Sequence, residues 1–199
     1  MRLFVAVEIE PALARELARV AKEVRTRVDS RAPGARLTWV AEDRLHFTVR
    51  FIGEVDAARA STIAASLAPP LTVDPFDLTM ANIGTFPSTS RPRVIWVGIR
   101  DGRDAMAAIE DEVSARLAAC GIPPEGRDYS PHLTLARVRD AATLRARDVV
   151  EGAPQGPLGT THVDAITLFE SRLSPKGPTY VALQRTPLRG PAKAGPHNT

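Results

Sequence analysis

Two periodicities of hydrophobic positions divide this chain into strands and helices. Short runs of apolar and β-branched residues predict strands at residues 3–7, 37–40, 45–52, 71–83, 93–99, 163–169 and 180–183. Apolar residues that recur every three or four positions predict amphipathic helices from Pro11 to Val28 and from Asp104 to Cys120. Shorter helices are expected at residues 56–67 and 141–150. The order of strand, helix, strand, strand and helix recurs loosely in the second half, which indicates two similar lobes.

Proline and glycine mark where these elements end. Residues 84–92 are expected to form a loop, and the Gly- and Pro-rich residues 152–159 a linker. From residue 186 onward glycine, proline and lysine dominate, so residues 186–199 are expected to be a disordered tail. Residues 1–185 then have a length that suits a single domain with two lobes sharing a core.

A short pattern of histidine and threonine occurs twice along the chain. It reads Leu45-His46-Phe47-Thr48-Val49-Arg50 in the first half and Pro131-His132-Leu133-Thr134-Leu135-Ala136-Arg137 in the second. Alternate side chains of a strand point to opposite faces, so each histidine shares a face with the threonine two residues later. Two of the chain's four histidines lie in this pattern. Each segment therefore presents an imidazole and a hydroxyl side by side.

Such a pair of imidazoles suits acid–base chemistry at phosphorus. Because the unperturbed pKa is about 6.5, one ring can accept a proton from the attacking oxygen while the other donates one to the departing oxygen. The two threonine hydroxyls can bind the non-bridging phosphate oxygens, and arginine adds a planar charged fork. Arg50 has even spacing from His46 and is expected to share its face. Arg137 lies five residues after His132, so a regular strand would turn it away unless the strand bulges.

Other chemistries lack their usual parts in this sequence. Neither motif has a carboxylate or a second histidine at the spacing of a zinc ligand set. A Gly-x-x-x-x-Gly-Lys-Ser/Thr loop and a Gly-x-Ser-x-Gly string are both missing. The single cysteine, Cys120, excludes an intramolecular disulfide framework and fits a reducing compartment. The motifs thus predict an acid–base site that uses neither a metal nor a cofactor.

Composition and charge narrow the class of protein further. The 199 residues are 44% hydrophobic and 25% charged, as in a soluble globular protein. The formal net charge of +3 equals that of Arg185, Arg189 and Lys193 near the end of the chain, so an anion site elsewhere must be a local cluster of arginines. Residues 1–10 lack the apolar run of a signal peptide or membrane span. We therefore expect a cytoplasmic monomer that does not bind membranes.

The sequence resembles the 2H phosphoesterases, and among them the RNA 2′,3′-cyclic phosphodiesterases, also called LigT-type 2′-5′ RNA ligases. The resemblance covers residues 1–185 and begins with the two His-x-Thr motifs. Further landmarks follow in the order of the family: Met1 to Val7, Trp39-Val40, Gly84-x-Phe86-Pro87, Pro92 to Gly98, Tyr129-Ser130, Leu168 to Ser171 and Gly177-Pro178-x-Tyr180. Departures at Phe47, Val49 and Tyr129 are apolar or aromatic exchanges that leave the chemistry untouched.

The resemblance implies both a fold and a reaction. The fold is α+β, with two pseudo-symmetric lobes, each an antiparallel sheet flanked by helices, and the active site in the cleft between them. The reaction is metal-independent hydrolysis of an RNA 2′,3′-cyclic phosphate end to a 2′-phosphate, with reversible 2′-5′ ligation when a ribose hydroxyl takes the place of water. By this likeness, His46 donates a proton to the departing 3′-oxygen and His132 activates water. Thr48, Thr134 and Arg137 then hold the phosphate oxygens.

Two other functions stay open at this point. The same residues could act on a small cyclic nucleotide, which an uncharged cleft would favour, whereas a basic groove would favour RNA. The third possibility is a nucleotide- or RNA-binding module without turnover, although binding alone does not require two titrating groups. Trp39, Phe86 and Tyr129 are either base-stacking residues or parts of the core and its rim.

Overall fold

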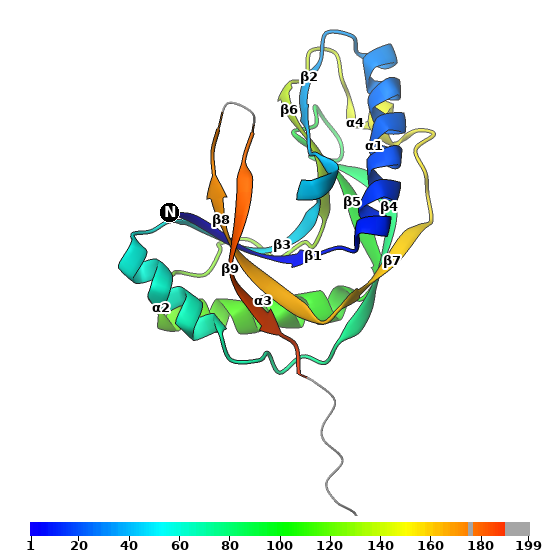
Figure 1. The fold of residues 1–199 in the computed structure, drawn as a ribbon. Helices are drawn as coiled ribbons and strands as arrows, with labels where there is room; N and C mark the ends of the chain where they lie inside the picture. Colours follow the sequence, from blue (N-terminus) through cyan, green and yellow to red (C-terminus); the bar gives the residue numbers. More distant parts are fainter. Residues whose placement is uncertain (175–176, 190–199) are drawn as a thin grey trace, which may run out of the picture.

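The computed structural model describes residues 1–174 and 177–189, and a nine-stranded antiparallel sheet is its main element (Figure 1). The strands are β1 (Arg2–Glu8), β2 (Arg36–Trp39), β3 (His46–Glu54), β4 (Phe76–Phe86), β5 (Val94–Asp101), β6 (Leu133–Asp140), β7 (Pro157–Val163), β8 (Ala165–Arg172) and β9 (Thr179–Pro187). The helices are α1 (Pro11–Arg31), the 3-10 helix η1 (Glu42–Arg44), α2 (Ala57–Leu67), α3 (Arg103–Ala119) and α4 (Ala146–Val150). In the described part of the chain, no helix combines the length and apolarity needed to cross a membrane.

The two motif strands lie at the centre of the sheet. The strand order is β7-β4-β5-β6-β3-β1-β8-β9, and β2 pairs with β6 outside this path. β3 and β6 are joined by a single residue pair, Phe47 with Leu133, and both side chains are 0% exposed. Figure 1 shows the two halves of the sheet inclined toward each other at this junction. The predicted α+β fold is confirmed, and the two expected sheets form one curled sheet through the motif strands.

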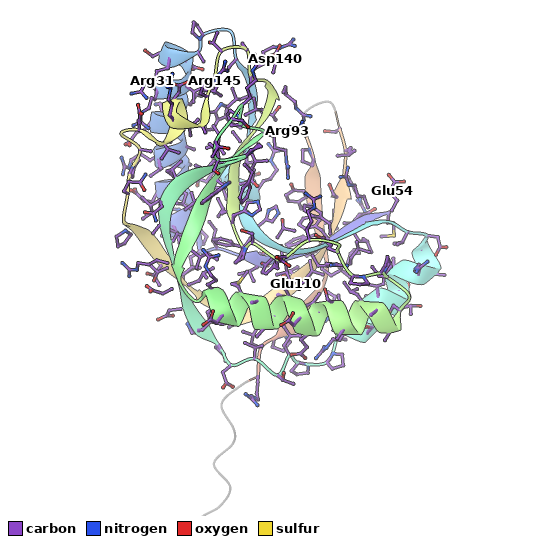
Figure 2. All side chains as sticks on the ribbon, turned by 180° about the vertical axis from the view of Figure 1, so that it is seen from behind. Arg31, Glu54, Arg93, Glu110, Asp140 and Arg145 are labelled. Carbon is purple, nitrogen blue, oxygen red and sulfur yellow. The ribbon has the colours of Figure 1, made fainter. Side chains whose placement is uncertain are left out.

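Each long helix packs against the half of the sheet that does not contain the strand before it. Helix α1 follows β1, yet its Leu13 contacts Gly159 of β7. Helix α3 follows β5, yet its Glu110 forms an ion pair with Arg50 of β3. Figure 1 shows α1 beside β4 and β5, and Figure 2 places Glu110 on the side of α3 that faces the sheet. The two lobes therefore share one hydrophobic core.

The helices predicted from hydrophobic periodicity are confirmed close to their expected bounds. Helix α3 buries the four apolar residues from which it was predicted: Met106, Ile109, Val113 and Leu117. Helix α2 begins after Asp56, whose carboxylate accepts a hydrogen bond of 2.8 Å from the amide of Arg59. The helix expected within residues 141–150 is limited to the short α4.

Three regions expected to be irregular belong in part to the sheet, and one of them is the expected loop at residues 84–92, into which β4 extends as far as Phe86. β7 begins at Pro157, inside the expected linker, and pairs with β4 at the edge of the sheet. Proline is tolerated at the first residue of an edge strand, so its presence concealed the strand. β9 continues past residue 185, the Thr186 hydroxyl donates to the Leu67 carbonyl oxygen at 2.6 Å, and Leu188 is buried. The expected tail boundary at 186 is thus too early, and residues 190–199 lie outside the described residues.

Candidate active site

The histidines and threonines of both motifs meet where the two halves of the sheet join. Antiparallel strands pair in reverse order, so the positions on either side of the central pair bring His46 opposite Thr134 and Thr48 opposite His132. The apolar residues between them enter the core, and these four side chains are all partly exposed on the other face. Segments far apart in the sequence thus form one polar cluster.

A β-bulge follows each motif at the same position. The register of β3 with β1 shifts at Val49, and the register of β6 with β5 shifts at Leu135. Each of these is the third residue after its histidine. An extra residue reverses the alternation of faces, so the fifth residue after each histidine, Phe51 or Arg137, is turned toward the site. The bulge therefore brings Arg137 to the face of its motif despite its odd spacing.

Arg50 does not share the face of His46, contrary to the expectation from its even spacing. Its side chain is 3% exposed and lies 3.5 Å from the carboxylate of Glu110. A second terminal nitrogen donates to the carbonyl oxygen of Pro123, in the loop that leads to the second motif. Because the bulge at Val49 turns Arg50 toward α3, this arginine connects structural elements and does not reach the site.

Each imidazole is held by a contact of the same kind with the backbone. The Nδ1 atom of His46 lies 2.8 Å from the carbonyl oxygen of Arg44, and that of His132 lies 2.7 Å from the carbonyl oxygen of Ser130. Only a protonated Nδ1 can donate to a carbonyl, so the neutral rings carry their proton there and leave Nε2 free to accept one. The Nε2 atom of His46 lies 3.1 Å from Oγ1 of Thr48.

The surroundings lower the pKa of both histidines. Burial is the largest influence on each ring, because it disfavours the imidazolium form, and the charge of Arg137 lowers both pKa values further. The two backbone carbonyls act in the opposite direction. Glu8, which pairs with His46 in the β1–β3 ladder, also raises the pKa of His46. The charge of Arg137 thus acts in the same direction on the pKa of both rings.

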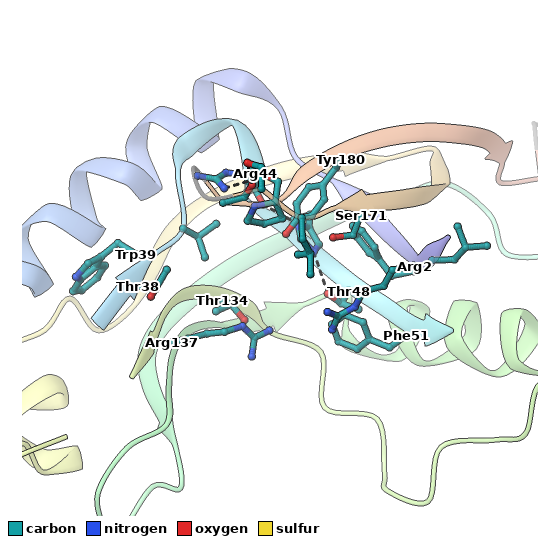
Figure 3. A pocket seen from close by; sticks show the side chains of 18 of the residues that line it. Arg2, Thr38, Trp39, Arg44, Thr48, Phe51, Thr134, Arg137, Ser171 and Tyr180 are labelled. Carbon is teal, nitrogen blue, oxygen red and sulfur yellow. Dashed lines mark hydrogen bonds between the residues drawn. The ribbon is translucent and has the colours of Figure 1, made fainter. Parts of the chain in front are cut away.

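A pocket of about 940 Å³ lies over the motif strands (Figure 3). Four of the five predicted site residues line it: His46, Thr48, Thr134 and Arg137. His132 is not one of its lining residues, and its ring packs edge-on against Phe86, with the ring centroids 5.0 Å apart. The pocket has the size of a small-molecule site.

The pocket is lined by four arginines, and no aspartate or glutamate of the described residues lines it. The arginines are Arg2, Arg44, Arg137 and Arg139. Figure 3 shows that Arg44 and Arg137 lie on opposite sides of the pocket. This arrangement produces a positive potential in a concave site, which favours an anion such as a phosphate.

His46 also lines a second pocket with the opposite charge. This pocket, of about 710 Å³, is lined by Glu8, Glu42 and Asp43, and it shares His46 and Arg44 with the first. His46 therefore lies between a cationic and an acidic cavity. The carboxylates of the second pocket disfavour a phosphate, so the charge of the first pocket is the one that suits an anion.

Of the three aromatic residues considered for base stacking, only Trp39 lines the cationic pocket. The hydroxyl of half-buried Tyr129 donates to a backbone oxygen of β3 at 3.1 Å, and Phe86 packs against the second histidine. Phe51 was missed by the sequence reasoning, although it lines the pocket and is 50% exposed. The signal that could have found it is its spacing from the first histidine, which equals that of Arg137 from the second.

The groups that meet at this site can exchange protons and bind an anion. Two imidazoles, each with its Nδ1 held by a backbone carbonyl, can supply an acid and a base at Nε2, and two hydroxyls and an arginine can donate to phosphate oxygens. Within the part of the chain that the structure describes, no three His, Cys, Asp or Glu side chains are arranged to hold a metal ion.

Known proteins are similar to this chain in sequence and in fold. A family model described as the 2′-5′ RNA ligase superfamily matches residues 10–174. A protein of Aeropyrum pernix named RNA 2′,3′-cyclic phosphodiesterase is 35% identical over 151 residues, which cover 75% of this chain and 85% of the relative. A protein of the same name from Methanocaldococcus jannaschii is 31% identical over 185 residues, which cover 92% of this chain and 99% of the relative.

Solved structures agree with the sequence comparisons. The crystal structure of TT0787 of Thermus thermophilus has a TM-score of 0.70 and 28% identity, and the match covers 96% of this chain and 99% of that one. Escherichia coli LigT complexed with 3′-AMP has a TM-score of 0.71, with 95% of this chain and 98% of that chain covered. At 24% identity, the second match is a likeness of fold.

Proposed function

This chain belongs to the 2′-5′ RNA ligase superfamily, and we propose that it hydrolyses RNA 2′,3′-cyclic phosphate ends to 2′-phosphates. The observation that carries the proposal is the mirrored pair of His-Thr motifs at the β3–β6 junction, beside a pocket lined by arginines. The relatives from A. pernix and M. jannaschii, which are named RNA 2′,3′-cyclic phosphodiesterase, support the substrate class.

The proton transfers follow from the nitrogen that each ring leaves free. The Nε2 atom of His132 accepts a proton from water, and the water oxygen forms a bond to phosphorus. The bond between phosphorus and the 3′-oxygen breaks, and the protonated Nε2 of His46 donates its proton to that oxygen. The Nδ1 contacts with the backbone carbonyls hold both rings in place while Nε2 gains or loses its proton.

The phosphate gains negative charge at its non-bridging oxygens as water attacks. The hydroxyls of Thr48 and Thr134 donate to these oxygens, and Arg137 adds a permanent positive charge from the same pocket. Because these groups are fixed in strands, little rearrangement is needed when the charge develops. When a ribose hydroxyl takes the place of water, the same residues give 2′-5′ ligation.

The alternative substrate, a small cyclic nucleotide, is favoured by one observation. A pocket of about 940 Å³ can accommodate a single nucleotide, so binding would not require contacts outside the pocket. The four arginines favour RNA, because a single cyclic phosphate carries one negative charge and the chain of an RNA supplies more.

One assay tests the proposal directly. The protein is treated with a chelator, incubated with an oligonucleotide that ends in a 2′,3′-cyclic phosphate, and the product is identified by mass spectrometry and phosphatase sensitivity. We expect a 2′-phosphate at a rate that the chelator does not change. A 3′-phosphate would contradict the assignment of His46 to the 3′-oxygen, and absence of hydrolysis would overturn the function.

A further inference from the structure

The cationic pocket has two chemically different ends, and the motifs lie between them. The end at β2 and β6 is formed by Thr38, Trp39 and Arg139, and the end at β1, β3 and β8 by Arg2, Phe51, Ser171 and Leu173. Figure 3 shows Thr38 and Trp39 on one side, Phe51 and Ser171 on the other, and the two motif threonines between them. The two ends thus extend in opposite directions from the site of the reaction.

The end at Phe51 combines Arg2 with two exposed apolar side chains. Phe51 is 50% exposed and Leu173 is 69% exposed, and both line the pocket. The ring centroids of Phe51 and Phe4 lie 6.2 Å apart, and Phe4 is only 3% exposed. A phenylalanine supported by the core on one side and half open to solvent is a platform on which a nucleobase can stack.

The end at Arg139 is distinguished by two neighbouring arginines, which lie beside Trp39. Arg137 and Arg139 are both exposed and lie two residues apart after the bulge, so they share the pocket face of β6. The Nε atom of Arg139 donates to Oγ1 of Thr38 at 3.1 Å, which orients the guanidinium. Among the described residues neither arginine pairs with a carboxylate, in contrast to Arg36, which pairs with Asp140 at 3.3 Å on the same ladder. Two adjacent guanidinium groups without a carboxylate partner suit successive phosphates of a strand.

We propose that an RNA 3′ end binds in one direction, with its terminal base stacked on Phe51 and the preceding phosphates directed along Arg137 toward Arg139. This inference rests on the proposed function, because it takes the cyclic phosphate to lie between the two motifs. The ribose of a terminal nucleotide carries its base and its 5′-phosphate on diverging bonds. A pocket with an exposed phenylalanine at one end and two adjacent arginines leading to the other matches that divergence.

The test compares two substrates that share a terminal nucleotide. One is adenosine 2′,3′-cyclic phosphate, and the other is a tetra-adenylate that ends in the same group. Phe51→Leu is expected to lower kcat/KM about tenfold on both, since the stacked base is present in both. Arg139→Gln is expected to lower the ratio of kcat/KM for the tetranucleotide to that for the mononucleotide about fivefold. It should also reduce the salt dependence of RNA binding by about 0.7 in the logarithmic slope, because one phosphate contact is lost.

Two further variants control for folding and for net charge. Phe51→Trp keeps a stacking surface and is expected to retain activity on both substrates, so it separates stacking from a general disturbance of β3. Arg25→Gln removes the same charge as Arg139→Gln from the outer face of α1, where Arg25 lies 3.7 Å from Asp29 and outside the pocket. It is expected to leave both rates at their wild-type values.

The possible outcomes distinguish this inference from the function on which it rests. If the wild-type protein hydrolyses both substrates and Arg139→Gln leaves their ratio unchanged, the direction of the strand is wrong and the function stands. If Phe51→Leu changes the ratio and Arg139→Gln does not, the strand runs the opposite way. If Arg25→Gln lowers the ratio as much as Arg139→Gln, net charge accounts for the effect and the inference is overturned. If the wild type hydrolyses neither substrate, the function and the inference both fail.

Discussion

The two halves of the site share a backbone frame and differ in what they place on it. In both motif strands the ring nitrogen contacts the carbonyl two residues earlier, and a bulge follows three residues later. The fourth residue after the histidine is Arg50 in β3 and Ala136 in β6, and the fifth is Phe51 in β3 and Arg137 in β6. The common frame brings two imidazoles to one site. The unlike residues around it give the two rings different surroundings.

The surroundings of the two rings differ most in charge. His46 lies in the wall between the cationic and the acidic pocket, and Glu8 raises its pKa. His132 packs against Phe86 and is influenced by burial, a backbone carbonyl and Arg137. A carboxylate near one ring favours its protonated form, which suits the acid, whereas the other ring is better placed as the base. A symmetric backbone frame can thus support unequal proton-transfer roles.

Removing either imidazole should produce the largest effect. We expect His46→Ala and His132→Ala each to lower kcat on an RNA 2′,3′-cyclic phosphate by about 10²- to 10⁴-fold, because each removes one proton-transfer group. The pH profile should lose its alkaline limb in the first variant and its acidic limb in the second. His162→Ala is a matched control, since His162 is exposed and pairs with Asp77 away from the pocket. A loss below tenfold in either motif variant would contradict the paired scheme.

Arg50, the fourth residue after His46, should contribute to the stability of the fold. Arg50→Ala leaves the carboxylate of Glu110, whose side chain is only 15% exposed, without its cation, and we expect the free energy of unfolding to fall by about 3 kcal/mol. Urea denaturation measures this change. Arg100→Ala breaks an exposed pair with Asp101 on β5 and is expected to cost less than about 1 kcal/mol. Equal losses in the two variants would show that Arg50 does not hold β3 against α3.

The two hydroxyls should have large but unequal effects on turnover. Thr48→Val and Thr134→Val are each expected to lower kcat about 10²-fold, because each removes a donor to the phosphate oxygens. The loss should be greater for Thr48, whose hydroxyl also lies 3.1 Å from Nε2 of His46. Steady-state kinetics measure both, and the Ser variants, which keep the hydroxyl, should stay within about tenfold of wild type. A lower kcat for Thr134→Val than for Thr48→Val would contradict this order.

The sequence predicted the parts of the site that local periodicity determines. Alternation of faces placed each histidine beside its threonine, and apolar spacing located α1 and α3. The bulges at Val49 and Leu135 could not be predicted, because both are ordinary strand residues and register depends on the neighbouring strand. The errors at Arg50 and Phe51 follow from this, since a bulge changes the face of the residues that follow it up to the next register shift. The single-pair junction of β3 and β6 likewise depends on long-range pairing.

Arg137 should shift the pH profile as a whole. Because burial and Arg137 both lower the pKa of the two histidines, the wild-type optimum is expected below the unperturbed value of about 6.5. Arg137→Gln removes a charge that disfavours both imidazolium forms, so both pKa values rise and both limbs move to higher pH. The lost contact with phosphate should also lower kcat/KM about tenfold. A shift of one limb alone would show that Arg137 acts on a single ring.

Glu8 should have the smallest effect, and it should act on one limb only. Its carboxylate raises the pKa of His46, so Glu8→Gln lowers that pKa and the acid loses its proton at a lower pH. The alkaline limb therefore moves to lower pH while the acidic limb, set by His132, stays in place, and the rate at the optimum changes less than about tenfold. Glutamine can still accept the hydrogen bond that the Thr167 hydroxyl donates at 2.7 Å, so β8 keeps its contact. Glu42→Gln, in the same acidic pocket, is the control that should leave both limbs unchanged. If Glu8→Gln moved the acidic limb instead, the base would be His46, and the roles of the two halves would be exchanged.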